Sequence, residues 1–466
     1  MFTRRAFTTH ALALGVGGGL LPAAGRAATD PQSPNLLRIL TPHGAEANLA
    51  PVAKSFEALC GCRAELVVVG VGEINAVLTL EAMLNDVGVD VALPATFGIP
   101  DLVEAEAILP LDGLAQQYAP QDLTDAMMYT SGDVFDDRLW GYQTDGDVFL
   151  MFYNKRFMEN PELRQKYADQ TGTDLTTPAT WEELDRQMAF FHDPDAGRYG
   201  GCLFRAADKV AWEWWARFHA KGAWPFSPTM EPQIAGAQGV AALEEMIASS
   251  AHLVGADLGL FANWARYREG DIYANIGWGG TQKSLYAPDS AMRDNLVNAS
   301  LPGGRINGAL VPMSYFNWGW SYVVAKNSRQ PELAYQFCVN AVSQKVGAEA
   351  IAQTGGFFDP FRTDQYQDPA IVDAYGAQFL SVHEQAMRSS MPDLYLARRG
   401  EYFDALSYWL QLALAGDATP EVALNNVAQS WRATTDRAGA TLQARRWMAL
   451  RDTYPAELRK ALRDET

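Results

Sequence analysis

Short apolar runs alternate with apolar residues at helical spacing along the first part of the chain. Residues 36–40, 65–69 and 89–93 are the runs, and the valine-rich second run is typical of a parallel strand buried on both faces. Between the runs, apolar positions recur three or four residues apart and predict helices over 48–60 and 73–86. This order of strands and helices predicts an α/β lobe with a mostly parallel sheet.

The pattern changes at residues 141–155, where a polar loop leads directly into a buried strand. The loop carries Asp145 and Asp147, and residues 148–153 are all apolar or aromatic. We expect such a transition where one lobe connects to another. Further along, Thr180 and Glu183 form a predicted capping box at a helix start, and a strand is predicted to end at Trp278.

Residues 1–28 are expected to be a twin-arginine (Tat) export signal peptide. Arg4 and Arg5 precede a weakly apolar, glycine-rich run over 11–21, and small residues near Arg26 suit a signal peptidase. A retained anchor is the alternative, although the run is short and glycine-rich for a membrane span. No other segment approaches 18 uninterrupted apolar residues, so we expect a soluble periplasmic protein without stable membrane insertion.

The charge balance is acidic and narrows the possible partners. The full chain has a formal net charge of −18, and removing 1–28 leaves 34 basic against 55 acidic residues, a net charge of −21. Such a surface argues against nucleic acid and anionic membranes as partners. The 438 remaining residues are enough for two or more cores.

Four cysteines are too few for a disulfide scaffold. Cys60 and Cys62 stand between a predicted helix and a predicted strand, without a nearby histidine or cysteine at zinc spacing. A disulfide across one residue would be strained, so we favour thiols and keep the short bridge as the alternative.

No pattern for catalysis, metal binding or cofactor binding emerges. The sequence lacks Gly-x-Ser-x-Gly and His-Glu-x-x-His motifs, and the histidines do not pair at ligand spacing. The segment 70–75 starts like a dinucleotide-binding turn, but Asn75 replaces its third glycine. Asp145 and Asp147 could serve a glycosidase, yet paired carboxylates equally suit hydrogen bonds to hydroxyl groups. We therefore expect no catalytic residues, no metal and no cofactor.

Several segments together resemble the carbohydrate-type family 1 of extracellular solute-binding proteins, which includes the maltodextrin-binding proteins. The resemblance covers about residues 36–435 and rests on the order of many weak signals. They are the crossing at 136–155, the segment Ile108-Leu109-Pro110-Leu111-Asp112, the pattern Thr180-Trp181-x-x-Leu184, and the segments 267–280, 301–304, 318–324 and 355–362.

The resemblance implies a type II periplasmic-binding-protein fold. Each of its two α/β lobes would have a mostly parallel sheet flanked by helices, and a hinge of about three crossings would join the lobes. Lobe 1 would comprise 36–145 and 320–365, and lobe 2 would comprise 146–319 and 366–435. Residues 436–466 are predicted to form an extra helical tail, for which the sequence suggests no function. Closure of the lobes around a ligand would be a hinge motion.

The implied function is capture of a carbohydrate or polyol and its delivery to the permease subunits of an ABC transporter, with the protein acting as a monomer. Aromatic side chains complement the C–H faces of sugars, and polar side chains complement their hydroxyl groups. Alternatives are a sulfonated or phosphorylated sugar, a polyamine, or hydrolysis of a glycoside. We interpret Trp212, Trp214 and Trp215, on one predicted helix, as core residues. The candidate ligand-binding residues are His43, Glu46, Thr96, Phe97, Asp145, Asp147, Phe204, Arg205, Trp278, Gly279, Trp318, Gly356, Phe357, Arg362 and Tyr402.

Overall fold

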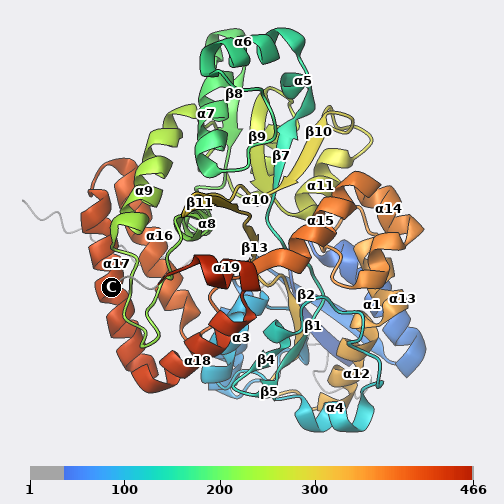
Figure 1. Ribbon diagram of the computed structural model, residues 1–466. Helices are drawn as coiled ribbons and strands as arrows, with labels where there is room; N and C mark the ends of the chain where they lie inside the picture. The colour runs from blue at the N-terminus through green and yellow to red at the C-terminus, as the bar shows by residue number, and fades with distance from the viewer. Residues whose placement is uncertain (1–35, 464–466) are drawn as a thin grey trace, which may run out of the picture. The chain divides into compact units, whose positions relative to one another are not determined.

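The alternating order predicted for the first part of the chain is present in the computed structural model, which describes residues 36–463 (Figure 1). The signal peptide predicted for 1–28 lies outside the described residues. The first elements are β1 (Leu36–Pro42), α1 (Glu46–Cys60), β2 (Arg63–Val69), α2 (Ile74–Leu84) and β3 (Val91–Ala92). β1 pairs in parallel with both β2 and β3, as expected for strands connected by helices.

Within residues 36–463, the first sheet has five strands in the order β2-β1-β3-β14-β6. β14 (Ser321–Val324) pairs antiparallel with β3 and with β6 (Gly141–Gln143), so this sheet is mixed. The expectation that residues 65–69 are buried on both faces is wrong. β2 is an edge strand whose residues alternate between exposed and half-buried, because only β1 pairs with it.

The second sheet of the described chain has four strands in the order β10-β7-β9-β8. They are β10 (Leu296–Ser300), β7 (Leu150–Asn154), β9 (Ile272–Gly277) and β8 (Tyr199–Cys202). Only the β8–β9 pair is parallel, since β7 enters from the first lobe and pairs antiparallel with β9 and β10. The predicted buried strand at the crossing is therefore correct, and every residue of β7 is buried.

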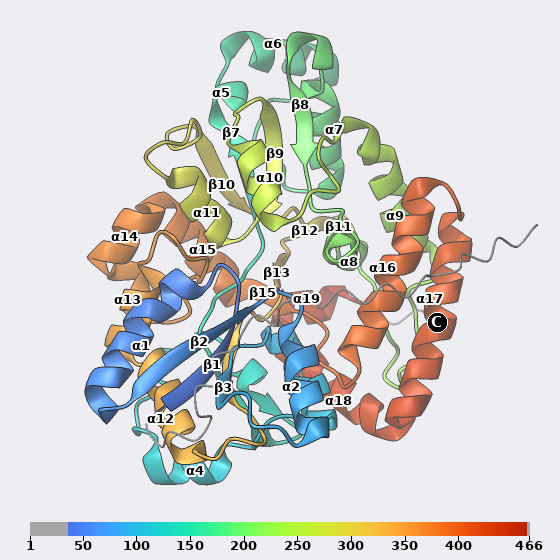
Figure 2. The same cartoon turned by 180° about the vertical axis from the view of Figure 1, so that it is seen from behind.

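Helices and short strands surround each sheet (Figures 1 and 2). Those following the first sheet's strands are η1 (Thr96–Gly98), α3 (Ile99–Glu104), α4 (Asp112–Tyr118), η2 (Ser131–Asp133), β4 (Val134–Phe135), β5 (Arg138–Leu139), α12 (Pro331–Val342), α13 (Gln344–Ile351) and η5 (Thr363–Gln367). The remaining elements before residue 393 are α5 (Lys155–Met158), α6 (Pro161–Thr171), α7 (Trp181–Phe191), η3 (Pro194–Ala196), α8 (Val210–Ala220), α9 (Ala237–Ser249), η4 (Ser250–His252), α10 (Leu260–Tyr267), α11 (Gly279–Tyr286), β11 (Gly304–Ile306), β12 (Ala309–Val311), β13 (Ser314–Phe316), α14 (Pro369–Tyr375), α15 (Ala377–Ser389) and β15 (Ser390–Pro392).

The N-cap predicted at Thr180 is confirmed, but the capping box is incomplete, because the Glu183 carboxylate binds the N–H of Ala179 and not that of Thr180. The Glu183 backbone N–H donates to Thr180 Oγ1 at 3.2 Å, which satisfies one of the helix's free N–H groups. The Glu183 carboxylate reaches back to accept from the Ala179 N–H at 2.8 Å. This local pairing fixes the first turn of α7 beside the second sheet.

The chain ends in four helices, α16 (Arg399–Ala415), α17 (Pro420–Ala438), α18 (Ala440–Thr453) and α19 (Ala456–Ala461). We call α18 and α19 the C-terminal pair. Trp447 of α18 is fully buried and donates its indole N–H to the Phe226 carbonyl at 3.2 Å. On the side of the first lobe, Arg446 donates to Asp136 in the β4–β5 turn at 2.9 and 2.5 Å. The C-terminal pair therefore contacts elements of both lobes, whose exact boundaries stay a prediction.

Cys60 and Cys62 form a disulfide, with 5.2 Å between their Cα atoms. Our preference for thiols is therefore wrong. The bridge becomes possible because Gly61 adopts a left-handed conformation (φ +66°) that turns the chain sharply at the end of α1. Cys202 and Cys338 are free and buried.

Candidate ligand-binding site

Three segments cross between the lobes side by side: 144–149, 316–321 and 357–362. The Thr144 N–H donates to the Trp320 carbonyl at 2.9 Å, and the Asn317 N–H donates to the Asp147 carbonyl at 3.3 Å. The third segment joins them where the Gly146 N–H donates to the Asp359 carbonyl at 3.2 Å. These hydrogen bonds place the side chains of the three segments in one region between the two sheets.

Three carboxylates meet in this region, from Asp145, Asp147 and Asp359. One oxygen of each lies within 4.8 Å of the others. Asp145 is fully buried and its Oδ1 accepts from the Asp359 N–H at 2.6 Å, whereas its Oδ2 has no hydrogen-bond partner within residues 36–463. Asp359 accepts from the Gly279 N–H at 2.6 Å and from the Tyr375 hydroxyl at 3.1 Å. We call these three residues the carboxylate group.

The carboxylate group holds protons more strongly than ordinary aspartates. Burial raises the pKa of Asp145 and of Asp147 well above the usual value, and repulsion from Asp359 raises both further. Burial also raises the pKa of Asp359 to about 7, although Lys283 opposes this effect. Asp147 and Asp359 share a hydrogen bond, which requires a proton on one of them. Spacing alone would allow a cation, but this shared proton offers a simpler account of how the charges coexist.

Lys283 of α11 supplies positive charge close to the carboxylate group. Its Nζ is buried and donates to the carbonyls of Ile351, Gln353 and Phe358 at 3.3, 3.1 and 2.9 Å. Burial lowers the pKa of Lys283 to about 8, while attraction to the three carboxylates opposes the shift. Lys283 thereby connects α11 of the second lobe to the end of α13 and to the segment that follows it.

Aromatic side chains lie beside the carboxylate group. We call Phe97, Phe149, Phe204, Trp212 and Trp278 the aromatic cluster. Trp278 contacts Phe149, Phe204 and Trp212, with ring centroids 4.6, 5.4 and 5.9 Å apart. The indole N–H groups of Trp212 and Trp278 are buried and have no hydrogen-bond partner among the described residues. The cluster thus combines flat apolar faces with two donors for a polar ligand.

The predicted residues Arg205 and Arg362 are bound within the protein. Arg205 pairs with the buried carboxylate of Glu213, with Nη2–Oε1 at 2.8 Å, and its guanidinium also donates to Ser249 and Ser250. Arg362 pairs with Asp364 and donates to two backbone carbonyls. Binding an anion through either arginine would break buried contacts, so the site we propose includes neither.

Three further predicted residues also have internal partners. The Trp318 indole donates to the Asp393 carbonyl at 3.1 Å. The Thr96 hydroxyl is 2.7 Å from that of Ser321. Tyr402 is fully buried among the C-terminal helices, with its hydroxyl 2.8 Å from that of Thr435.

His43, Glu46, Gly356 and Phe357 lie around the start of α1. His43 Nδ1 is 3.1 Å from Glu46 Oε1, and both side chains are solvent-exposed. Phe357 is buried, and its ring centroid is 5.8 Å from that of Trp320. Gly356 packs directly against the side chain of Asn48 in α1, where a Cβ would not fit.

Sequence reasoning missed Asp359, Lys283 and Trp212. Asp359 stood in the segment 355–362, but no spacing rule related it to Asp145. Trp214 and Trp215 are fully buried as expected, whereas Trp212 is half-buried and contacts Phe97 of the first lobe at 6.3 Å. Helical periodicity indicates that Trp212 lies on a different face of the helix from Trp215. It does not indicate which residue Trp212 contacts.

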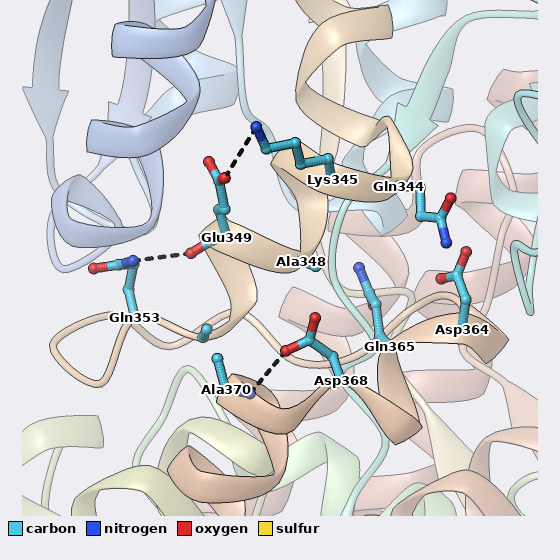
Figure 3. Close-up of a pocket in the computed structure, with 10 residues that line it drawn as sticks. Gln344, Lys345, Ala348, Glu349, Gln353, Asp364, Gln365, Asp368 and Ala370 are labelled. Carbon is cyan, nitrogen blue, oxygen red and sulfur yellow. Dashed lines mark hydrogen bonds and ion pairs between the residues drawn. The ribbon is translucent and has the colours of Figure 1, made fainter.

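A surface pocket of about 500 Å³ lies between α13 and the η5–α14 segment (Figure 3). Among its lining residues, Lys345 pairs with Glu349 at 3.9 Å, and Gln353 donates to the Glu349 carbonyl at 2.9 Å. None of the predicted ligand-binding residues lines this pocket. Another pocket, of about 260 Å³, separates α18 from the β4–β5 turn and includes Trp318.

Over residues 36–463, no helix is both long and apolar enough to cross a membrane.

The two sheets, the three crossings and the polar and aromatic residues between them define a two-lobed binding protein. The sequence profile of the bacterial extracellular solute-binding proteins matches residues 42–348, and the chain belongs to this family. The resemblance seen in the sequence and the two-lobed type II fold are thereby confirmed. No curated protein sequence matches the chain.

Solved structures with the same fold include several ABC transporter solute-binding proteins. One from Agrobacterium radiobacter, in complex with ribitol, has a TM-score of 0.73 at 17% identity, over 86% of this chain and 98% of that one. One from Agrobacterium vitis, with bound D-mannitol, has a TM-score of 0.71 at 18% identity, over 87% and 99%. A maltose-bound protein from T. maritima has a TM-score of 0.70 at 16% identity, over 85% and 99%.

Proposed function

We propose that this protein binds a carbohydrate or polyol between its lobes and delivers it to the permease subunits of an ABC-type importer. The main support for this proposal is that the carboxylate group and the aromatic cluster lie next to each other between the sheets. The neighbouring residues Gly279 and Trp278 connect the two. Hydroxyl groups both donate and accept, so they suit carboxylate oxygens and indole N–H groups together. The ribitol, D-mannitol and maltose bound by proteins of the same fold support this ligand class.

We propose Asp147, Phe149, Trp212 and Trp278 as the main ligand contacts, with Phe97 and Phe357 at the edges. Asp147 is half-buried, unlike Asp145, and so remains able to meet a ligand. Asp145 is better suited to hold the third crossing, because its Oδ1 already binds the Asp359 N–H. A hydrolytic role for this pair is disfavoured, because a carboxylate engaged in this way is poorly placed to attack or protonate a glycoside.

The ligand can be tested by isothermal titration of the mature protein with alditols, hexoses and polyamines. We expect binding of a neutral polyol or sugar, weakened at least tenfold by Trp278→Ala and by Asp147→Asn. Trp409→Ala and Asp404→Asn on α16 are matched controls that should retain wild-type affinity. Binding of polyamines alone would contradict the carbohydrate assignment and identify the carboxylate group as a site for cations.

We further propose export by the Tat pathway to the periplasm, supported by Arg4 and Arg5 and by membership of an extracellular family. Replacing both arginines with lysine should retain the protein in the cytoplasm, which cell fractionation would detect. Unchanged periplasmic accumulation of the double variant would contradict the Tat assignment. We propose that the exported protein acts as a monomer, which analytical ultracentrifugation would test.

A further inference from the structure

We infer that His383 is a positioning residue for ligand binding, because it holds the turn that presents Asp147 to the ligand. The inference rests on the proposed function, in which Asp147 is a main ligand contact. His383 lies on α15, which packs against β10 of the second sheet, and its side chain is fully buried. A helix of the second lobe would thereby set the direction of a carboxylate on the first crossing.

Asp147 is the central residue of a tight turn. The Val148 N–H donates to the carbonyl of Gly146, two residues back, at 2.7 Å, which is the hydrogen bond of a γ-turn. The Gly146 N–H in turn donates to the Asp359 carbonyl of the third crossing at 3.2 Å. Because the direction of a side chain follows from the conformation of its backbone, this turn decides where the Asp147 carboxylate points.

His383 binds the carbonyl on which this turn closes. Its Nε2 lies 2.9 Å from the Gly146 oxygen, which therefore accepts from both the Val148 N–H and the imidazole. A Cβ on Gly146 would lie 2.0 Å from the Pro360 oxygen and 3.3 Å from His383 Cε1, so only glycine fits between them. Rotating the Gly146 carbonyl away would break both of its hydrogen bonds in one step.

The hydrogen-bond partners of His383 assign its tautomer. A carbonyl can only accept, so Nε2 must carry the proton that is donated to Gly146. Nδ1 is then the acceptor, and it lies 2.8 Å from the Tyr366 hydroxyl, which can donate to it. Burial lowers the pKa of His383 to about 3, although the bond to Gly146 opposes this shift, so the ring is neutral near pH 7.

The helices around His383 also hold Asp359, which shares a hydrogen bond with Asp147. Tyr375, the last residue of α14, donates from its hydroxyl to Asp359 Oδ1 at 3.1 Å. Phe379 of α15 connects the two side chains, since its ring centroid is 5.5 Å from that of Tyr375 and 5.5 Å from that of His383. These three rings therefore support the first and third crossings together, and His383 is the one that contacts the turn.

Two substitutions separate the two hydrogen bonds of His383. A glutamine amide reaches about as far as Nε2 and still donates to the Gly146 carbonyl, whereas an asparagine amide reaches only about as far as Nδ1. Isothermal titration of the mature protein with ribitol, D-mannitol and maltose gives the affinities. The ligand that binds the wild type should bind about tenfold more weakly to His383→Asn and less than about threefold more weakly to His383→Gln. Equal affinities of the two variants, whether retained or lost together, would overturn the proposal.

A double-mutant cycle tests whether His383 acts through Asp147. In the Asp147→Asn background, His383→Asn should weaken binding by less than about threefold, because the two losses have one cause. A purely structural role would give losses that multiply, and that result would overturn the positioning role. Urea unfolding of each variant without ligand shows whether a change in affinity follows a change in stability.

Long-range proton–nitrogen NMR of isotopically labelled histidines detects the tautomer directly. His383 should be neutral with its proton on Nε2, and its signals are identified by their absence from the spectrum of His383→Gln. His219 provides an internal reference of the opposite kind, because its Nδ1 lies 2.8 Å from the Trp215 carbonyl and must carry the proton there. A proton on Nδ1 of His383 would overturn the proposal.

Failure of this inference is distinguishable from failure of the proposed function. If the wild type binds one of the three ligands and the two His383 variants bind it equally, the proposed function stands and the positioning role is wrong. If the wild type binds none of them, the proposed function fails and the positioning role fails with it.

Discussion

Replacing Asp359 with asparagine should change how stability depends on pH, because this carboxyl is buried in a region that favours its protonated form. Burial raises its pKa from the usual 3.8 to about 7. Between these values the native state binds a proton that the unfolded state has released, so the free energy of unfolding falls as pH rises. The slope for one such proton is about −1.4 kcal/mol per pH unit. Over about three pH units, Asp359 accounts for a loss of about 4 kcal/mol.

Lys283 does not obscure this effect. Its pKa falls from 10.5 to about 8, so it is protonated in both states below pH 7 and adds no slope there. Lys283 changes the free energy of unfolding only between about pH 8 and pH 10.5, where the free energy falls as the pH decreases. The asparagine side chain is neutral at every pH, so the free energy of unfolding of Asp359→Asn relative to wild type should increase by about 4 kcal/mol between about pH 4 and about pH 7.

Urea unfolding at constant ionic strength, followed by the fluorescence of the 13 tryptophans, measures this difference. The exposed Asp404→Asn provides the control, whose pH dependence should match that of the wild type. Comparing variants cancels the contributions of carboxylates distant from Asp359. Asp145 and Asp147 do not cancel, because the charge of Asp359 raises their pKa values, and its loss reduces their slope in the same direction. Parallel pH profiles for Asp359→Asn and wild type would refute the reasoning, since they would mean that Asp359 titrates as it does in the unfolded chain.

Three further changes test other parts of the structure. Glu213→Gln should destabilise the protein by about 3–5 kcal/mol in urea unfolding, because it leaves the buried Arg205 and Arg217 without their shared carboxylate; a change under about 1 kcal/mol would contradict this. Trp447→Ala should cost about 3–5 kcal/mol by leaving a cavity beside Phe226, whereas the half-exposed Met448→Ala should have little effect. Reducing the Cys60–Cys62 bridge should cost only about 1–2 kcal/mol, because it closes a very short loop; reversible loss of the fold in reductant would show a larger role.

The sequence predicted where strands and helices form better than it predicted which of them pack against one another. The apolar runs located β1, β2 and β7, because a run of β-branched and other apolar residues favours a strand whether it is fully buried, as β7 is, or partly exposed, as β2 is. The position of β2 at the sheet edge is a property of strand order, which depends on contacts distant in sequence. The same limit explains why the mixed direction of the second sheet was not expected.

The site was predicted only in part, because it too depends on contacts between residues that are distant in sequence. Asp147 and Trp278 stand next to a loop and a strand end, positions that sequence patterns identify, and the structure brings their segments together. Lys283 gave no comparable signal, because a lysine in a predicted helix is normally solvent-exposed. Its burial depends on hydrogen bonds to the carbonyls of Ile351, Gln353 and Phe358, which are distant from it in sequence.

The contacts of the C-terminal pair have a consequence for how the protein unfolds. Trp224 and Phe226 complete their packing only with Trp447, and Tyr454 fills the space beside Trp224, with ring centroids 5.0 Å apart. Arg446 links the same helix to the other lobe. Detaching α18 would therefore expose apolar surface and remove an inter-lobe ion pair in the same event. The two lobes should lose their structure in one cooperative transition rather than as separate domains, although the chain passes between them several times.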